Sequence, residues 1–160
     1  MSEIDRRARI VAERVKETGI DEAMIERLVR AFYARIQTHD VLGPIFAARI
    51  DDWELHITRL CAFWSSVALG TGAYSGSPMR KHLNLPVDGR HFDLWIGLFL
   101  QTARDICPAA QADYLVERAK RIAESLETAI AVENGVMLFN GDRLKRPDAD
   151  VFFPAVQPID

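Results

Sequence analysis

The chain has 160 residues, 49% hydrophobic and 27% charged, which predicts one soluble globular domain with a single core. Its net charge of -3 argues against a surface that neutralises the phosphates of nucleic acid or of an anionic membrane. No apolar run approaches the roughly 20 residues of a membrane-spanning helix, and the opening residues contain no hydrophobic block typical of a signal peptide. We therefore expect a cytoplasmic protein that binds neither nucleic acid nor membrane.

The first third of the chain predicts two helices followed by a break. Apolar residues at helical spacing over 9–16 indicate a short amphipathic helix that stops at Gly19. Asp21 is a favourable N-cap for a longer helix with an apolar stripe over 25–36. That helix is expected to be broken by Thr38-His39-Asp40 and then by Gly43-Pro44.

Two further helices are predicted in the middle of the chain, on either side of an irregular segment. Asp51 or Asp52 can cap the first of them, which carries a broad apolar face. The segment 70–86 is rich in glycine, serine and proline, so the part that holds His82 can form only a turn or two of helix. Asp88 then caps a strongly apolar helix.

The end of the chain predicts one more long helix and a tail. Pro108 starts this helix and Asn134-Gly135 stops it. In the tail, Asn140-Gly141 between apolar residues could turn a hairpin, but a tail laid across the surface is the favoured interpretation. No strands alternate with helices, so the fold class is all-α. We assign 1–135 to one helical domain with a short N-terminal helix and 136–160 to a C-terminal extension that is not an independent domain.

Two of the four histidines lie among apolar residues and are candidate ligands. His39 is expected in a turn, and His91 is expected to face solvent in the first turn of its helix. His56 lies in an apolar stripe and His82 among Met and Leu residues. Each, taken alone, is more often a core histidine than a ligand. With the aromatic residues around them they suit a flat apolar cofactor such as haem, which needs an axial ligand, apolar walls and basic residues at its edge.

The cysteines predict neither disulfides nor covalent attachment of a cofactor. Cys61 and Cys107 form no CxxC motif, so both are expected to be small, buried, reduced side chains. Because no CxxCH motif is present either, a haem would be held non-covalently.

Short motifs follow one another in a specific order over residues 21–130. They are Ala31-Phe32-Tyr33, Leu42-Gly43-Pro44-Ile45-Phe46, Asp52-Trp53-Glu54-Leu55-His56, Phe63-Trp64, Tyr74-Ser75-Gly76-Ser77-Pro78, Lys81-His82-Leu83-Asn84-Leu85-Pro86 and Phe92-Asp93-Leu94-Trp95. In this order they closely resemble the truncated haemoglobins, and group III is the best match among them. The resemblance implies a truncated globin-like 2-on-2 helical sandwich around haem, with the proximal helix mostly reduced to loop.

The resemblance also implies a set of site residues. His82 matches the proximal ligand of the haem iron, and Phe46 matches an aromatic that packs on the porphyrin. Tyr33, His56 and Trp95 match distal hydrogen-bond donors that face a bound ligand. The other expected haem contacts are Phe63, Trp64, Leu85, Phe92 and Ile96, and the expected propionate partners are Arg59 first, then Arg80 and Lys81.

The function implied by the resemblance is reversible binding of O2, CO or NO at haem b (iron protoporphyrin IX). A first alternative is a haem enzyme with NO dioxygenase or peroxidase-type activity, which would take NO or peroxide and receive electrons from a separate reductase. An alternative from another class is a haem-free helical module that binds a partner, with His56 and His82 as core residues.

Overall fold

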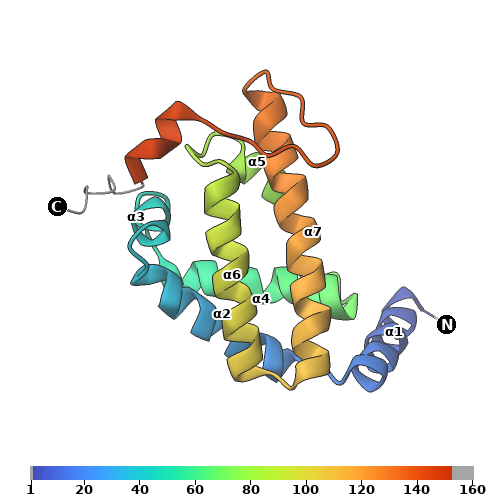
Figure 1. Ribbon diagram of the computed structural model, residues 1–160. Helices are drawn as coiled ribbons and strands as arrows, with labels where there is room; N and C mark the ends of the chain where they lie inside the picture. Colours follow the sequence, from blue (N-terminus) through green and yellow to red (C-terminus); the bar gives the residue numbers. More distant parts are fainter. Residues whose placement is uncertain (1, 153–160) are drawn as a thin grey trace.

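The computed structural model describes residues 2–152, and its regular elements are helices only (Figure 1). In chain order they are α1 (Glu3–Thr18), α2 (Glu22–Gln37), α3 (Leu42–Ala47), α4 (Trp53–Leu69), α5 (Pro78–His82), α6 (Gly89–Ile106), α7 (Ala109–Glu133) and the 3-10 helix η1 (Pro147–Phe152). No strand occurs within the described range, so the all-α prediction is confirmed. None of these helices has the length and apolar character needed to cross a bilayer.

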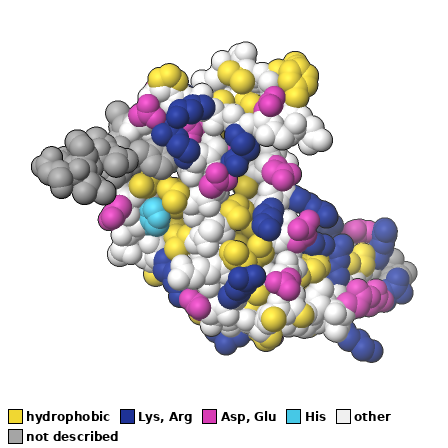
Figure 2. Space-filling model, in the orientation of Figure 1, with side chains coloured by type: hydrophobic (Ala, Val, Ile, Leu, Met, Phe, Trp, Pro, Cys, Tyr) yellow, Lys and Arg dark blue, Asp and Glu magenta, His cyan; other side chains and the backbone are white. Residues whose placement is uncertain are grey.

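Two pairs of helices form the body of the protein. α6 and α7 lie side by side in Figure 1, and the short Cys107-Pro108 connection makes them antiparallel. α2 and α4 pack against each other behind that pair, and α2 also packs against α6. The predicted 2-on-2 sandwich is therefore confirmed. Figure 2 shows charged side chains of both signs interspersed over the visible face.

Three aspartates begin the main helices as predicted. Asp21, Asp52 and Asp88 each accept a backbone N–H from two or three residues further on, at 2.8–3.1 Å. Such bonds satisfy N–H groups that have no partner within the helix. Of the two candidate caps before α4, Asp52 is the one used. At the other ends of α1 and α4, Gly19 and Gly70 adopt the left-handed conformation that glycine tolerates best.

The predicted bounds of the first helix were wrong. α1 runs from Glu3 to Thr18, well beyond the predicted 9–16. Its start is fixed by a capping box. The Ser2 hydroxyl accepts the backbone N–H of Asp5, and the Asp5 carboxylate accepts the backbone N–H of Ser2. Residues 3–9 are exposed, so they extend the helix without adding to the apolar stripe on which the prediction rested.

α2 ends at Gln37, so the break predicted at Thr38-His39-Asp40 is confirmed, but the break predicted at Gly43-Pro44 is wrong because both residues lie inside α3. Pro44 falls in the first turn, where a backbone N–H would have no helical partner, so its missing N–H costs little. His39 lies in the preceding turn as predicted, and its Nδ1 accepts the N–H groups of Val41 and Leu42. The imidazole thereby pairs two backbone N–H groups at the start of α3.

The irregular segment before α6 and the tail after α7 agree with the sequence prediction. α5 is a single turn that ends at His82, with Ser77 as its N-cap. Residues 136–146 form no strand, and Leu144 is buried against Val87 and Ile130, so this part of the tail lies on the domain surface. Phe153, which belongs to the apolar end of the predicted tail, lies outside the described residues.

The cysteines are both free thiols. Cys107 is buried at the end of α6, and Cys61 is half-buried on α4. Burial raises the pKa of both thiols, which therefore stay protonated at neutral pH.

The side chain of Phe99 lies where the two helix pairs pack against each other. It is 1% exposed and has Phe32 at 5.2 Å, Trp64 at 5.2 Å and Trp95 at 5.6 Å between ring centroids. We expect Phe99→Ala to lower the free energy of unfolding by about 3–5 kcal/mol, because it removes buried surface and leaves a cavity. Phe139→Ala, at a ring 69% exposed, is the matched control and should change it by less than about 0.5 kcal/mol. Urea unfolding of the two variants measures this, and equal effects would contradict the packing described.

Candidate functional site

Three predicted distal residues meet at one place although they come from three helices. Tyr33 on α2 and His56 on α4 have ring centroids 5.4 Å apart and nearly perpendicular rings. The indole N–H of Trp95 on α6 donates a hydrogen bond to the Tyr33 hydroxyl. Because an indole N–H can only donate, the Tyr33 oxygen accepts and its own proton stays available for a ligand. The structure thus brings the three donors together.

Burial sets the charge of these donors. It raises the pKa of Tyr33 well above its usual range, and the hydrogen bond from Trp95 offsets this only in part. Burial also lowers the pKa of His56 to about 4, with smaller electrostatic contributions from His82, Arg59 and Lys81. At neutral pH the site therefore presents a protonated phenol and an uncharged imidazole, and both can donate a hydrogen bond.

Two further aromatic rings enclose the distal residues. Phe46, predicted as a haem contact, lies 5.8 Å from Tyr33 between ring centroids. Trp53 stacks near Phe46 at 6.5 Å and lies 5.9 Å from His56. Trp53 belongs to one of the motifs named above but was not predicted as a site residue. Its position three residues before His56 is the signal that could have assigned it to this cluster.

His82 has the local structure of a metal ligand. It is half-buried at the end of α5, and its Nδ1 is hydrogen-bonded to the Pro78 carbonyl. A carbonyl only accepts, so Nδ1 carries the proton and Nε2 of the neutral ring keeps its lone pair. Burial lowers the pKa of His82, and the bond to Pro78 opposes this. The neutral ring is the form that binds a metal.

Two of the predicted propionate partners line a cavity of about 360 Å³ between α4 and α5. Arg59 and Lys81 line it together with Tyr74 and Ser75, so it offers two cations and two hydroxyls. The Lys81 ammonium is 6.0 Å from the centre of the Tyr74 ring. The chemistry of this lining suits carboxylates. Arg80 is exposed and does not line the cavity.

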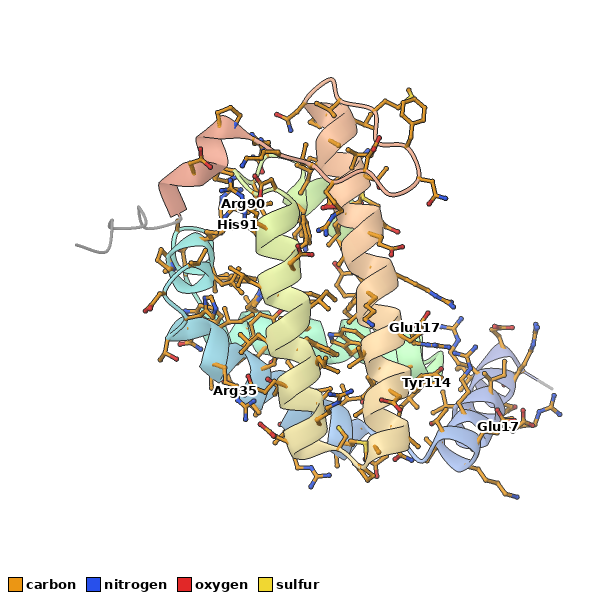
Figure 3. The ribbon with its side chains drawn as sticks, in the orientation of Figure 1. Glu17, Arg35, Arg90, His91, Tyr114 and Glu117 are labelled. Atoms are coloured by element: carbon orange, nitrogen blue, oxygen red, sulfur yellow. The ribbon has the colours of Figure 1, made fainter. Side chains whose placement is uncertain are left out.

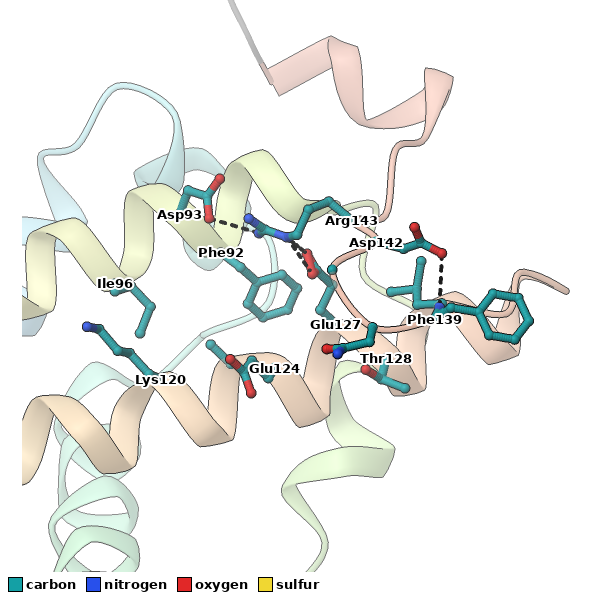
Figure 4. Close-up of a pocket in the computed structure, with 14 residues that line it drawn as sticks. Phe92, Asp93, Ile96, Lys120, Glu124, Glu127, Thr128, Phe139, Asp142 and Arg143 are labelled. Atoms are coloured by element: carbon teal, nitrogen blue, oxygen red, sulfur yellow. Dashed lines mark hydrogen bonds and ion pairs between the residues drawn. The ribbon is translucent and has the colours of Figure 1, made fainter.

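The remaining predicted haem contacts lie in other surroundings. Phe63 packs against Tyr74 at 5.4 Å between ring centroids, next to the cavity just described. Trp64 is 4% exposed and stacks on Phe99 in the core. Leu85 and Phe92 pack against the buried cluster that includes Ile130. Phe92 and Ile96 also line a cavity of about 480 Å³ between α6, α7 and the tail (Figure 4).

The prediction that His91 faces solvent was wrong. Its side chain is 3% exposed, and its Nδ1 accepts the backbone N–H of Asp88 at 3.1 Å. This bond completes a capping box at the start of α6, which draws the imidazole inward over the first turn. His91 is therefore a structural residue of the helix N-terminus.

The residues present fit a haem. His56 Nε2 is buried and has no hydrogen-bond partner among residues 2–152, although buried polar atoms are normally paired. His82 keeps Nε2 available for iron, and Arg59 with Lys81 suits two carboxylates. Within the same described range, no group of three or more His, Cys, Asp or Glu side chains could hold a metal ion.

By sequence and by fold, the chain is similar to truncated haemoglobins. Residues 16–130 match the family described as bacterial-like globin. A group 3 truncated haemoglobin from Campylobacter jejuni is 29% identical over 121 residues, which cover 72% of this chain and 95% of that protein. A group 1 truncated haemoglobin from a Nostoc strain is 37% identical over 70 residues, 43% of this chain and 58% of that protein.

Two solved structures have similar folds. The crystal structure of a group III truncated haemoglobin from Campylobacter jejuni superposes with a TM-score of 0.66 at 29% identity, covering 69% of this chain and 91% of that one. A group II truncated haemoglobin from Bacillus anthracis has a TM-score of 0.60 at 22% identity, with 71% and 88% covered, and shows a likeness of fold alone.

Proposed function

Because the chain belongs to the bacterial-like globin family, as a group III truncated haemoglobin and hence a globin haem protein, we propose that it reversibly binds O2, CO and NO at a non-covalently held haem b. The observation that supports this proposal is the buried His56 Nε2, which has no hydrogen-bond partner among residues 2–152 and belongs to a ring 5.4 Å from that of Tyr33. A cytoplasmic location and a separate reductase remain predictions from the sequence.

The proximal side of the proposed site depends on His82. Its Nε2 would hold the haem iron, and the Pro78 carbonyl fixes the tautomer that makes Nε2 the free nitrogen. Ferrous haem supplies the position at which a diatomic ligand binds and gains electron density.

The distal side supplies hydrogen-bond donors in a low-dielectric pocket. Tyr33 accepts from Trp95 and so has its own O–H free to donate, while the uncharged His56 ring can present an N–H toward the same place. Such donors stabilise a ligand that carries partial negative charge more strongly inside the protein than they would in water. Phe46 and Trp53 limit the access of water to these donors. We infer that polar O2 gains more from this pocket than CO does.

Arg59 and Lys81 are the proposed partners of the haem propionates, since they line one cavity. Both side chains are exposed, and exposed ion pairs contribute little, so we expect each alanine variant to raise the haem dissociation rate only about two- to fivefold. Transfer of haem to excess apomyoglobin measures this rate. Arg80→Ala is the matched control, because Arg80 does not line the cavity. An effect of Arg80→Ala as large as that of Lys81→Ala would contradict the assignment.

The test of the proposed function is a haem titration of the purified protein. Absorption spectra of the ferric, ferrous and ferrous-CO forms should show equimolar uptake and a sharp shift of the Soret band when CO is added. Failure to take up haem stoichiometrically would contradict the proposal and favour the haem-free helical module.

A further inference from the structure

The loop that joins His82 to α6, residues 83–88, forms no helix, and we call it the proximal loop. It directly follows the predicted iron ligand in the sequence, and the helix α5 before it is only one turn long. We propose that Arg49 and Arg146 are positioning residues that hold this loop, and through it His82, in place. The inference rests on the proposed function, because it assigns these residues a role toward haem.

The proximal loop needs hydrogen-bond donors from elsewhere in the chain. Within it, the Leu85 N–H donates to the His82 carbonyl at 3.1 Å, which closes a single turn. Pro86 has no N–H to contribute. The backbone carbonyls that follow His82 therefore have few local donors, and a carbonyl without a donor is costly wherever water is excluded.

Two arginines provide the missing donors. Arg49, from the segment between α3 and α4, donates to the Asn84 side-chain oxygen and to the Asn84 carbonyl, each at 3.0 Å. Arg146, from the C-terminal extension, donates to the Leu85 carbonyl at 2.7 Å. Two successive carbonyls, at the second and third residues after His82, are thus bound by charged guanidinium groups. Bonds from a charged donor are stronger than those between neutral groups.

The end of the loop is also bound to the extension. The Arg146 backbone N–H donates to the Asp88 carboxylate at 3.1 Å, and the Gly89 N–H donates to the Leu144 carbonyl at 2.9 Å. Asp88 is completely buried, yet bonds from Arg90 and Arg146 keep its pKa below the usual value despite the opposing effect of burial. Asp88 therefore stays ionised at neutral pH and keeps its bond to the extension.

The C-terminal extension is itself bound to the helices, so it can hold the proximal loop in place. Arg143 donates to the Glu127 carboxylate at 2.9 Å and to the Gly89 carbonyl at 2.8 Å, and it pairs with Asp93 (Figure 4). Leu144 is 3% exposed and packs in the cluster that includes Val87 of the loop. Because the extension is held on α6 and α7, Arg146 reaches the loop from a fixed position.

The experiment compares Arg146→Ala and Arg49→Ala with the full-length wild type, all loaded with haem. One measurement is the haem dissociation rate to excess apomyoglobin. The second is the iron–histidine stretching band in the resonance Raman spectrum of the ferrous, unligated form. We expect about tenfold faster haem loss, from the loss of charge-assisted bonds, together with a shifted or broadened band. Arg146→Lys keeps a charged donor and should lie between the alanine variant and the wild type.

Two variants serve as controls. Lys145→Ala removes the exposed neighbour of Arg146 in the extension. Arg35→Ala removes an arginine that joins α2 to Thr102 and Asp105 near the far end of α6 (Figure 3). Both controls should leave the iron–histidine band unchanged, even if Arg35→Ala lowers overall stability.

Each outcome either supports or overturns the inference. An unchanged band in both Arg146→Ala and Arg49→Ala would overturn it, and so would an equal change in Arg35→Ala, which would indicate a general loss of stability. If the wild type itself shows no iron–histidine band, the proposed function fails first and the inference falls with it. A normal wild-type band with unaffected arginine variants would overturn the inference alone.

Discussion

His82→Gly should lose stable haem binding and regain it when imidazole is added. His82 is the histidine whose Nε2 is kept free by the bond from Nδ1 to Pro78, so its removal takes away the predicted axial ligand and leaves a gap of imidazole size. Haem affinity should fall by more than about a hundredfold, because the loss of even an outer-shell partner costs about ten- to hundredfold. Haem titration followed by the Soret band, with and without imidazole, measures both effects.

The matched control for this prediction is His56→Gly. His56 lies beside Tyr33 and is proposed to be on the distal side, so this variant should still take up haem and show the iron–histidine band of the wild type. If His82→Gly retains that band and His56→Gly loses it, the two histidines have been assigned to the wrong sides of the haem.

Tyr33→Phe should release O2 about ten- to hundredfold faster than the wild type. The substitution removes one hydroxyl from a buried site, and a hydrogen bond to a charged group contributes about 1.5–3 kcal/mol, where each 1.4 kcal/mol is about tenfold in affinity. The CO dissociation rate should change much less, because bound CO carries less negative charge. Stopped-flow displacement of each ligand from the ferrous protein gives both rates.

Tyr74→Phe provides the comparison for Tyr33→Phe. Tyr74 lines the cavity with Arg59 and Lys81, away from the distal cluster, so losing its hydroxyl should leave the O2 rate near that of the wild type. An unchanged O2 rate in Tyr33→Phe would contradict the distal role of Tyr33. A large effect on both O2 and CO would instead indicate that the substitution opens the pocket.

The features that depend on nearby residues were predicted well. Asp21, Asp52 and Asp88 cap their helices through bonds to residues two or three positions away, and the short helix at His82 follows from the prolines around it. The 2-on-2 arrangement and group III membership came from the order of motifs over 21–130. The residue roles carried over with that order remain predictions, although the structure does bring Tyr33, His56 and Trp95 together.

The errors also have local causes that composition and spacing did not reveal. The extra turns of α1 come from a capping box formed by Ser2 and Asp5 outside the apolar stripe. Pro44 was interpreted as a break, but a proline in a first turn is compatible with a helix. His91 was assigned to solvent, but its side chain closes the capping box of α6. For α1 and His91, a capping box that the hydrophobic pattern does not show decided the outcome.

By itself, the sequence determined the main helices, the three aspartate caps, the family and the identity of the candidate ligands. Only the tertiary structure decided which side chains from distant segments share one environment. Trp53 of α4 stacks near Phe46 of α3, and Arg146 binds the carbonyl of Leu85, 61 residues earlier in the chain. The physical reason is the distance along the chain over which each feature is set. Helix caps and apolar stripes depend on neighbours within about one helical turn, whereas a contact between distant segments depends on how the helices pack.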